Sequence, residues 1–174
     1  MASWNQDLYL DALNFAALAH LGQTIPGGDV PYTVHLCQVA MEVMASPACD
    51  DLSLACALLH DTLEDTSTSF EELRLRFGSE VAIGVLALTK NEALPKAEQM
   101  LDSLKRLRDS SPKVQLVKLA DRITNLQEPP HYWSAEKRLY YRAEAGQILE
   151  ALAPSDPFLA VRLETKIREY ARYL

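Results

Sequence analysis

Residues 58–67 read LLHDTLEDTS and place four ionisable side chains within six positions, directly after an apolar run. These side chains belong to His60, Asp61, Glu64 and Asp65. Residues four apart lie on one face of a helix, so we expect Glu64 one turn beyond His60 and Asp65 one turn beyond Asp61. Charges beside a buried core are costly unless something compensates them. A metal ion, a salt bridge or open water could supply that compensation.

Length and composition describe an ordinary globular chain. The 174 residues are 48% apolar and 24% charged, which predicts a single domain over 1–174 with a real core. The net charge of −7 argues against a nucleic-acid-binding surface, because phosphate backbones recruit Lys and Arg. A small anionic ligand is still compatible with this charge, since a few local cations or a metal ion can attract it.

The sequence also restricts location and partners. The first residues, MASWNQDLYLDAL, are neither basic nor continuously apolar, so they do not resemble a signal peptide. No apolar run approaches the roughly 18 residues that span a bilayer. Three cysteines without a CxxC pair predict neither a disulfide framework nor a zinc knuckle. We therefore expect a cytoplasmic protein with no nucleic-acid or membrane partner, and the sequence leaves its oligomeric state open, a homo-oligomer included.

Helical spacing of apolar residues runs through the chain, with no convincing alternating strand. The stretch QTIPGGDVPY (23–32) is rich in Pro and Gly and predicts a loop. Thr33 is a plausible N-cap, and Ser69 with Glu72 forms a capping-box pattern. The fold is therefore predicted to be all-α, a compact bundle of about eight to ten helices. The expected helices lie at about 8–21, 33–46, 51–65, 69–77, 79–88, 95–109, 112–127, 135–152 and 157–173.

Side chains suited to a metal site occur on three of these predicted helices. His35 lies early in one, His60 and Asp61 lie in the next, and Asp121 lies in KLADRITN (118–125). Together they would form a mixed nitrogen and oxygen site, which suits a divalent transition ion better than calcium. Open positions would remain for water and substrate oxygens, as catalysis requires. Each signal alone is also typical of an ordinary surface pair or salt bridge, but the order H…HDxxED…KLADRxxN is much more specific.

With these residues the sequence resembles the HD-domain phosphohydrolases, and within them the hydrolase domain of the Rel/Spo stringent-response family and the stand-alone small alarmone hydrolases. The resemblance extends from residue 19 to about 145. The matching stretches include AHLGQ (19–23), PYTVH (31–35), LLHDTLEDT (58–66), FGSEVA (77–82) and VKLADRITNL (117–126).

The resemblance assigns roles to individual residues. It implies one bound manganese ion, with the ligands His35, His60, Asp61 and Asp121. It implies that Glu64 and Asp65 activate or orient the attacking water. It also implies that the substrate contacts Tyr32, Asn125 and Lys118.

The implied activity is removal of the 3′-pyrophosphate from an alarmone nucleotide, (p)ppGpp or (p)ppApp. One loop departs from the family pattern, because TIPGGDV (24–30) has Ile25 where relatives that hydrolyse guanosine tetraphosphate typically carry an Arg. Ile offers neither charge nor guanidinium stacking, so guanine and adenine substrates both stay open. The alternatives are a phosphatase acting on NADPH or another 2′- or 3′-phosphorylated nucleotide, and a non-catalytic nucleotide-binding module. Retention of Glu64 and Asp65 argues against the last.

Overall fold

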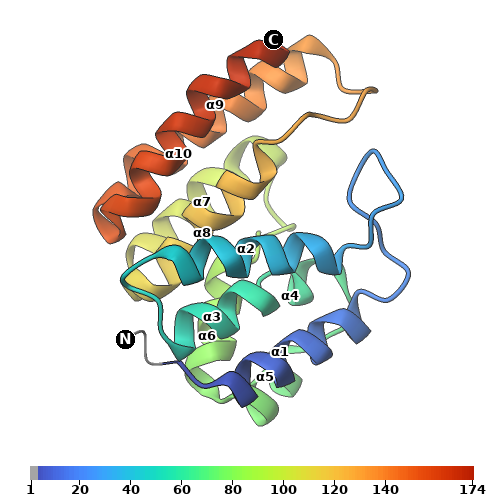
Figure 1. Cartoon of the computed structure of the whole chain (residues 1–174), viewed down its shortest axis with the longest axis vertical. Helices are drawn as coiled ribbons and strands as arrows, with labels where there is room; N and C mark the ends of the chain where they lie inside the picture. The colour runs from blue at the N-terminus through green and yellow to red at the C-terminus, as the bar shows by residue number, and fades with distance from the viewer. Residues whose placement is uncertain (1–3) are drawn as a thin grey trace.

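The structure is a computed structural model that describes residues 4–174. These residues form ten α-helices and two short 3-10 helices, and they contain no β-strand beyond an isolated bridge between Thr24 and Pro31 (Figure 1). The all-α prediction is thereby confirmed. The helices are α1 (Gln6–Ala19), α2 (Thr33–Ala45), α3 (Asp51–Leu59), α4 (Thr62–Asp65), α5 (Phe70–Phe77), α6 (Ser79–Leu88), α7 (Lys96–Arg108), α8 (Pro112–Asn125), α9 (Ala135–Leu152), η1 (Ala153–Ser155), α10 (Pro157–Glu169) and η2 (Tyr170–Tyr173).

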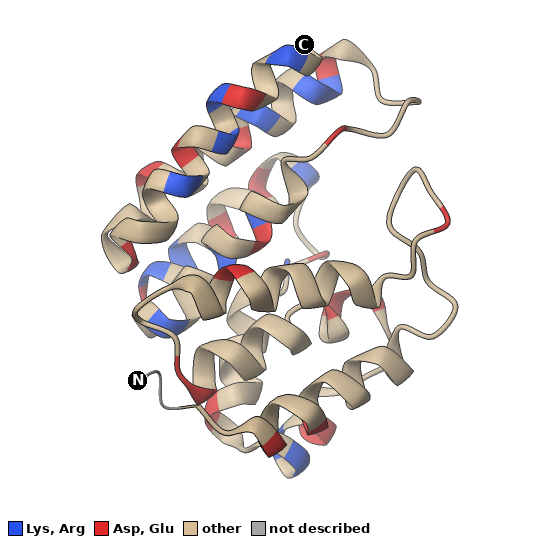
Figure 2. Ribbon diagram, in the orientation of Figure 1, with Lys and Arg blue, Asp and Glu red and all other residues tan. Residues whose placement is uncertain are grey.

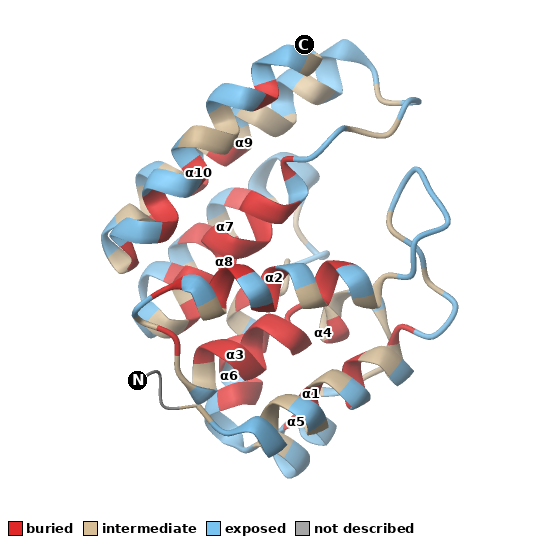
Figure 3. Cartoon of the chain, in the orientation of Figure 1, coloured by how far each residue is buried: buried red, intermediate tan, exposed pale blue. Residues whose placement is uncertain are grey.

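Helix α3 is the buried centre of the bundle and packs against α1, α2, α6 and α8 (Figure 1). Residues 53–59 are all buried (Figure 3), because this part of α3 is apolar or small on every face. A helix with that pattern is stable only inside a core. Burial of one Leu side chain contributes about 1.5–3 kcal/mol, so α3 holds the residues that follow it in a fixed place.

Helices α2 and α8 pack against α3 and against each other, while α9 and α10 cover α8 from outside. Many of the charged residues lie along α9 and α10 (Figure 2). Helix α8 differs from α3 because it buries polar side chains as well as apolar ones, and among them are Lys118, Asp121 and Thr124. Within residues 4–174, no helix has the length and apolar character needed to cross a membrane.

The predicted helix over 51–65 is wrong in one respect, because it is broken after Leu59. The hydroxyl of Thr62 donates to the carbonyl of Leu59 over 2.7 Å, and Nδ1 of His60 lies 2.8 Å from the carbonyl oxygen of Ala57. In a continuing helix, backbone amides would donate to these carbonyls. Here side chains bond to them. The chain turns at His60 and Asp61 before α4 begins.

The other helix boundaries follow local signals with one exception. Ser69 caps α5 as predicted, since its hydroxyl accepts from the amide of Glu72 at 3.2 Å. Thr33 is the first helical residue of α2, and the cap position belongs to Tyr32, which makes no side-chain capping bond. The Tyr32 side chain instead turns toward the region where α3 ends.

Two helical glycines test the packing of the core. A Cβ on Gly84 in α6 would lie 2.6 Å from Sγ of Cys56 and 3.0 Å from Cγ2 of Val114, whereas one on Gly146 in α9 meets nothing within 4 Å. We expect Gly84→Ala to lower the free energy of unfolding by about 1–3 kcal/mol through overpacking. The matched change Gly146→Ala should raise it by about 0.5–1 kcal/mol through helix propensity. Urea denaturation followed by circular dichroism measures both, and equal effects would contradict this packing.

Candidate metal centre and active site

The four predicted ligands converge at one point of the fold. His35 comes from α2, His60 and Asp61 from the turn after α3, and Asp121 from α8. Nε2 of His35 lies 3.7 Å from Oδ2 of Asp61 and 3.6 Å from Oδ1 of Asp121. Nε2 of His60 lies 2.8 Å and 3.7 Å from the same two oxygens. Neighbouring ligands that share an ion at about 2.0–2.2 Å are roughly 3–3.5 Å apart, so these separations match a common centre.

The orientation of His60 fits a metal ligand. Its Nδ1 is held by the Ala57 carbonyl, which directs Nε2 toward the two carboxylates. Nε2 is buried and faces Oδ2 of Asp61 at 2.8 Å and Oδ1 of Asp121 at 3.7 Å. Metal-binding histidines are commonly held by a carbonyl on the opposite nitrogen. Together with His35 and Asp121, whose ligand atoms lie within 4.8 Å of each other and of His60, it forms a group able to hold a divalent ion.

The three predicted substrate contacts touch the ligands directly. The hydroxyl of Tyr32 donates to Oδ2 of Asp61 over 2.5 Å. Lys118 donates from Nζ to Oδ2 of Asp121 over 2.9 Å, and the Asn125 amide donates to Oδ1 of the same carboxylate. Lys118 is buried, whereas Asn125 is exposed at the end of α8. These side chains therefore orient the two carboxylates, and their contact with a substrate stays a prediction.

Electrostatics make the metal-free cluster a network of ion pairs. Burial lowers the pKa of His60, but Asp61 and Asp121 outweigh it and raise that pKa to about 10. Burial alone would raise the pKa of Asp121. The charge of Lys118 and the hydrogen bonds of the two histidines outweigh burial and hold the pKa of Asp121 well below its usual range. The pKa of Asp61 is likewise lowered, since His60 and His35 outweigh burial and the charge of Asp121. Both carboxylates are therefore ionised at neutral pH, as metal ligands must be.

The two predicted catalytic carboxylates have different surroundings. Glu64 is held by Lys90, whose amide donates over 3.0 Å and whose Nζ donates over 2.7 Å. Asp65 is exposed, and its pKa is raised by partial burial and then by the nearby charges of Asp61 and Glu64. The raised pKa of Asp65 favours proton uptake by this carboxylate, and the two bonds from Lys90 fix the position of Glu64.

Residues before α2, His20 and Gln23 among them, support this side of the site. His20 is buried, stacks on the Tyr32 ring at 4.8 Å, and its Nδ1 lies 2.7 Å from Oε1 of Gln23. Gln23 in turn donates from Nε2 to the carbonyl of Asp65 over 2.7 Å. The loop after α1 is thereby tied to α4.

Two functional neighbours were missed at the sequence level. Lys90 reaches Glu64 from the end of α6, and Thr124 places its hydroxyl 3.5 Å from Nδ1 of His35. Thr124 lies in KLADRITN and could have been found by its helical spacing from Asp121. Lys90 belongs to the family-like stretch LTK (88–90), but its contact with Glu64 was not predicted, because the two residues are far apart in the sequence.

Two cavities of about 340 Å³ each meet at Tyr141, next to the ligand cluster. One reaches His35 and Asn125 and has largely apolar walls. The other contains three cations, Lys90, Lys96 and Lys137, and one carboxylate, Glu144. The first cavity therefore borders the predicted ligand His35, and the second borders Lys90, which contacts Glu64.

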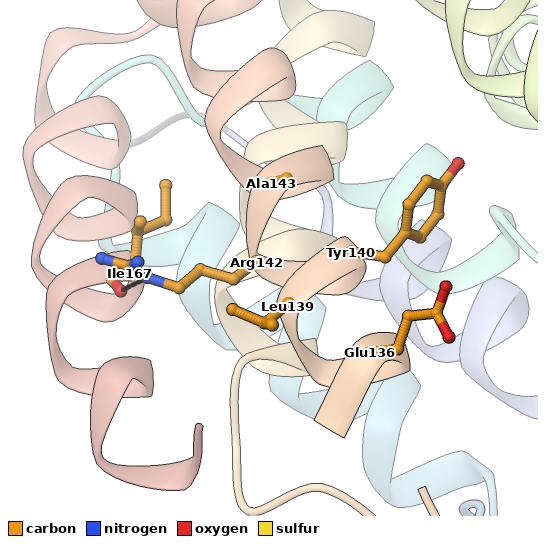
Figure 4. Close-up of a pocket in the computed structure, with 6 residues that line it drawn as sticks. All are labelled: Glu136, Leu139, Tyr140, Arg142, Ala143 and Ile167. Atoms are coloured by element: carbon orange, nitrogen blue, oxygen red, sulfur yellow. Dashed lines mark hydrogen bonds between the residues drawn. The ribbon is translucent and has the colours of Figure 1, made fainter. Parts of the chain in front are cut away.

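A larger hollow of about 690 Å³ lies between α9 and α10, away from this chemistry (Figure 4). In it, Arg142 reaches toward α10 and donates from Nε to the carbonyl of Ile167 over 2.9 Å, while Glu136 and Tyr140 point to the other side. None of the predicted site residues lines it. Choosing the larger cavity would therefore place the active site at the wrong position.

Comparison with known proteins gives a consistent result. Residues 12–156 match the HD domain family. The guanosine-3′,5′-bis(diphosphate) 3′-pyrophosphohydrolase MESH1 of Xenopus tropicalis is 35% identical, over 90% of this chain and 91% of that protein. The human protein of that name is 37% identical, over 82% and 83% respectively. The solved structure of a metazoan orthologue of SpoT, described as hydrolysing ppGpp and acting in starvation responses, superposes with a TM-score of 0.87 at 29% identity, over 99% of this chain and 100% of that one.

Proton release on metal binding tests the arrangement of the cluster. Because the pKa of His60 in the metal-free protein is raised to about 10, its imidazole is protonated at neutral pH and must lose that proton to bind an ion. The affinity for Mn²⁺ should therefore increase with pH, by up to about tenfold per pH unit for one released proton. Titration calorimetry in two buffers of different ionisation enthalpy should show about one proton released per ion. An affinity that does not change with pH would contradict the assignment.

Proposed function

Because the chain belongs to the HD-domain family and to its branch of MESH1-type hydrolases, we propose that it removes the 3′-pyrophosphate of an alarmone nucleotide, (p)ppGpp or (p)ppApp. The observation that carries this proposal is the cluster of His35, His60, Asp61 and Asp121 beside the carboxylates Glu64 and Asp65. A hydrolase acting on a phosphate ester needs both a centre for charge stabilisation and a proton acceptor for water. These six side chains supply both.

The cluster would hold one divalent ion, and we propose Mn²⁺. Its mixed imidazole and carboxylate donors support a transition ion over calcium. When bound, such an ion supplies Lewis-acid activation of a phosphate ester and of water. Tyr32 and Lys118 keep Asp61 and Asp121 oriented, and burial raises the pKa of Tyr32 so that its hydroxyl stays a donor.

The remaining residues handle the proton and the substrate charge. Asp65 accepts the proton of the attacking water, and Glu64, fixed by Lys90, orients that water. Lys96 and Lys137 line the cationic cavity with Lys90, which supports a substrate that carries several phosphates. This local positive charge offsets the net charge of −7 of the whole chain.

The domain extent, the partner and the location of the proposed enzyme are inferred from the sequence. We treat residues 1–174 as one catalytic domain whose partner is a small nucleotide, and we place it in the cytoplasm. The free state of Cys37, Cys49 and Cys56 in the described chain supports a reducing compartment.

The released product tests the reaction. Purified protein with Mn²⁺ should release pyrophosphate from ppGpp or pppApp, and chromatography of the nucleotide products identifies the bond that is cleaved. Release of orthophosphate from NADPH or another 2′- or 3′-phosphorylated nucleotide, without pyrophosphate from either alarmone, would favour the phosphatase alternative. Nucleotide binding with no product at all would support the non-catalytic alternative.

Separate substitutions test the division between ligands and catalytic carboxylates. Asp61→Ala and Asp121→Ala should abolish Mn²⁺ binding, because each removes one donor. Glu64→Gln and Asp65→Asn should retain the ion and lower kcat by about 10²–10⁴-fold, the usual size of a lost acid–base contribution. Calorimetry and steady-state kinetics measure the two effects. Loss of the ion in Glu64→Gln would show that Glu64 acts as a ligand.

A further inference from the structure

Arg106 in α7 closes the C-terminal end of α6 with three hydrogen bonds. Its Nη1 donates to the carbonyls of Leu86 and Ala87 over 3.1 Å each, and its Nη2 donates to the carbonyl of Thr89 over 2.8 Å. The last carbonyls of an α-helix have no partner within the helix and must find one elsewhere. At this end of α6, one guanidinium group from a neighbouring helix is that partner.

The guanidinium of Arg106 is fixed in position as well. Its Nε donates to Oδ2 of Asp102, one turn earlier in α7, over 2.8 Å. The planar guanidinium presents its donors in a rigid fork that reaches several oxygens at once, and its charge lies at the negative end of the α6 dipole. These bonds therefore set where α6 ends and in which direction the chain leaves it.

The chain leaves α6 through a peptide group that contacts the predicted active site. The carbonyl of Thr89, which accepts from Arg106, and the amide of Lys90 belong to this one peptide group. The Lys90 amide donates to Oε2 of Glu64 over 3.0 Å, and Nζ of Lys90 donates to Oε1 over 2.7 Å. Because a peptide group is planar, fixing its carbonyl also fixes the direction of its N–H. A hydrogen bond at the carbonyl further polarises the N–H and strengthens its bond to the carboxylate.

We propose that Arg106 is a positioning residue for the hydrolysis, and that it acts on Glu64 through the peptide group between Thr89 and Lys90. The inference rests on the proposed function, in which Glu64 orients the attacking water. Arg106 lines neither of the two cavities next to the ligand cluster, so it acts without touching the substrate. The machinery of the site thereby extends to a part of α7 that carries no ligand and no catalytic carboxylate.

A role of Arg106 in folding alone predicts a different pattern of effects. If Arg106 only held α7 against α6, its loss would lower the amount of folded enzyme whatever residue stands at position 64. If Arg106 acts through Glu64, its loss matters only while that carboxylate is present. Arg108 serves as the control, because it lies two positions later in α7 and is exposed.

A double-mutant cycle with Glu64→Gln separates these two roles. Arg106→Ala alone should lower kcat about tenfold, because a slightly displaced carboxylate orients the water less well. KM and the affinity for Mn²⁺ should stay within about twofold, since ground-state binding is kept. In the Glu64→Gln background, Arg106→Ala should change kcat by less than about twofold. Arg108→Ala should leave kcat unchanged in both backgrounds. Equal losses from Arg106→Ala in both backgrounds, or a rise in KM alone, would overturn the proposal.

Hydrogen exchange of backbone amides tests the same contact without substrate. In Arg106→Ala, the Lys90 amide should exchange about tenfold faster than in the unchanged protein, because the peptide that directs it to Glu64 is no longer held. The amide of Ala82, which donates to the carbonyl of Gly78 at the start of α6, should keep its rate. Unchanged exchange at Lys90, or equal acceleration at Ala82, would overturn the proposal. If the unchanged protein cleaves neither alarmone, the proposed function fails, and exchange at Lys90 alone decides whether Arg106 holds Glu64.

Discussion

The break between α3 and α4 is the constraint on which the rest of the site depends. His60 and Asp61 keep backbone dihedrals in the right-handed helical region (φ −55, ψ −33 and φ −99, ψ 0), so the two side chains leave the end of α3 in neighbouring directions. The hydroxyl of Thr62 and Nδ1 of His60 hold carbonyls at the end of α3, and the chain turns. The two side chains then approach to 2.8 Å between Nε2 and Oδ2, where both can meet His35 and Asp121.

The cluster lies next to the apolar core, so the negative charges of Asp61 and Asp121 must be compensated by nearby positive charges. An unpaired buried carboxylate would be strongly destabilising, and the α8 sequence provides Lys118 one turn before Asp121 to prevent it. The histidines contribute further positive charge, so each acid faces a partner even without a metal ion. Such an arrangement serves the site more than the fold, since well-packed apolar residues of similar volume would stabilise α8 at least as well. The apolar α3 supplies the stability that the polar face of α8 does not.

Local patterns in the sequence predicted most of the helices and the set of candidate ligands. Pro and Gly marked the loop 23–32, Ser69 marked the start of α5, and the order of His35, His60, Asp61 and Asp121 marked the cluster. The helix break was not predicted, because the residues 58–65 also suit a continuous helix and only side-chain bonds to carbonyls decide between the two.

Contacts between distant segments were equally beyond the sequence. Lys90 meets Glu64, and Gly27 meets Pro130, only because α6 and the two loops are brought together by the packed core. The cavity between loop 24–30 and segment 127–133 is therefore less predictable than the ligand cluster. The sequence TIPGGDV shows directly that this loop has no Lys or Arg. The sequence does not show that Trp133 and Tyr141 line the same cavity as Ile25 and Pro26.

Anomalous diffraction from a crystal grown with Mn²⁺ tests the central claim most directly, namely that the turn at His60 and Asp61 completes a single metal centre. We predict one strong peak, with ligand bonds of about 2.0–2.3 Å from His35, His60, Asp61 and Asp121. A peak that lacks either His60 or Asp61 as a ligand, or a continuous helix through these two residues, would contradict it.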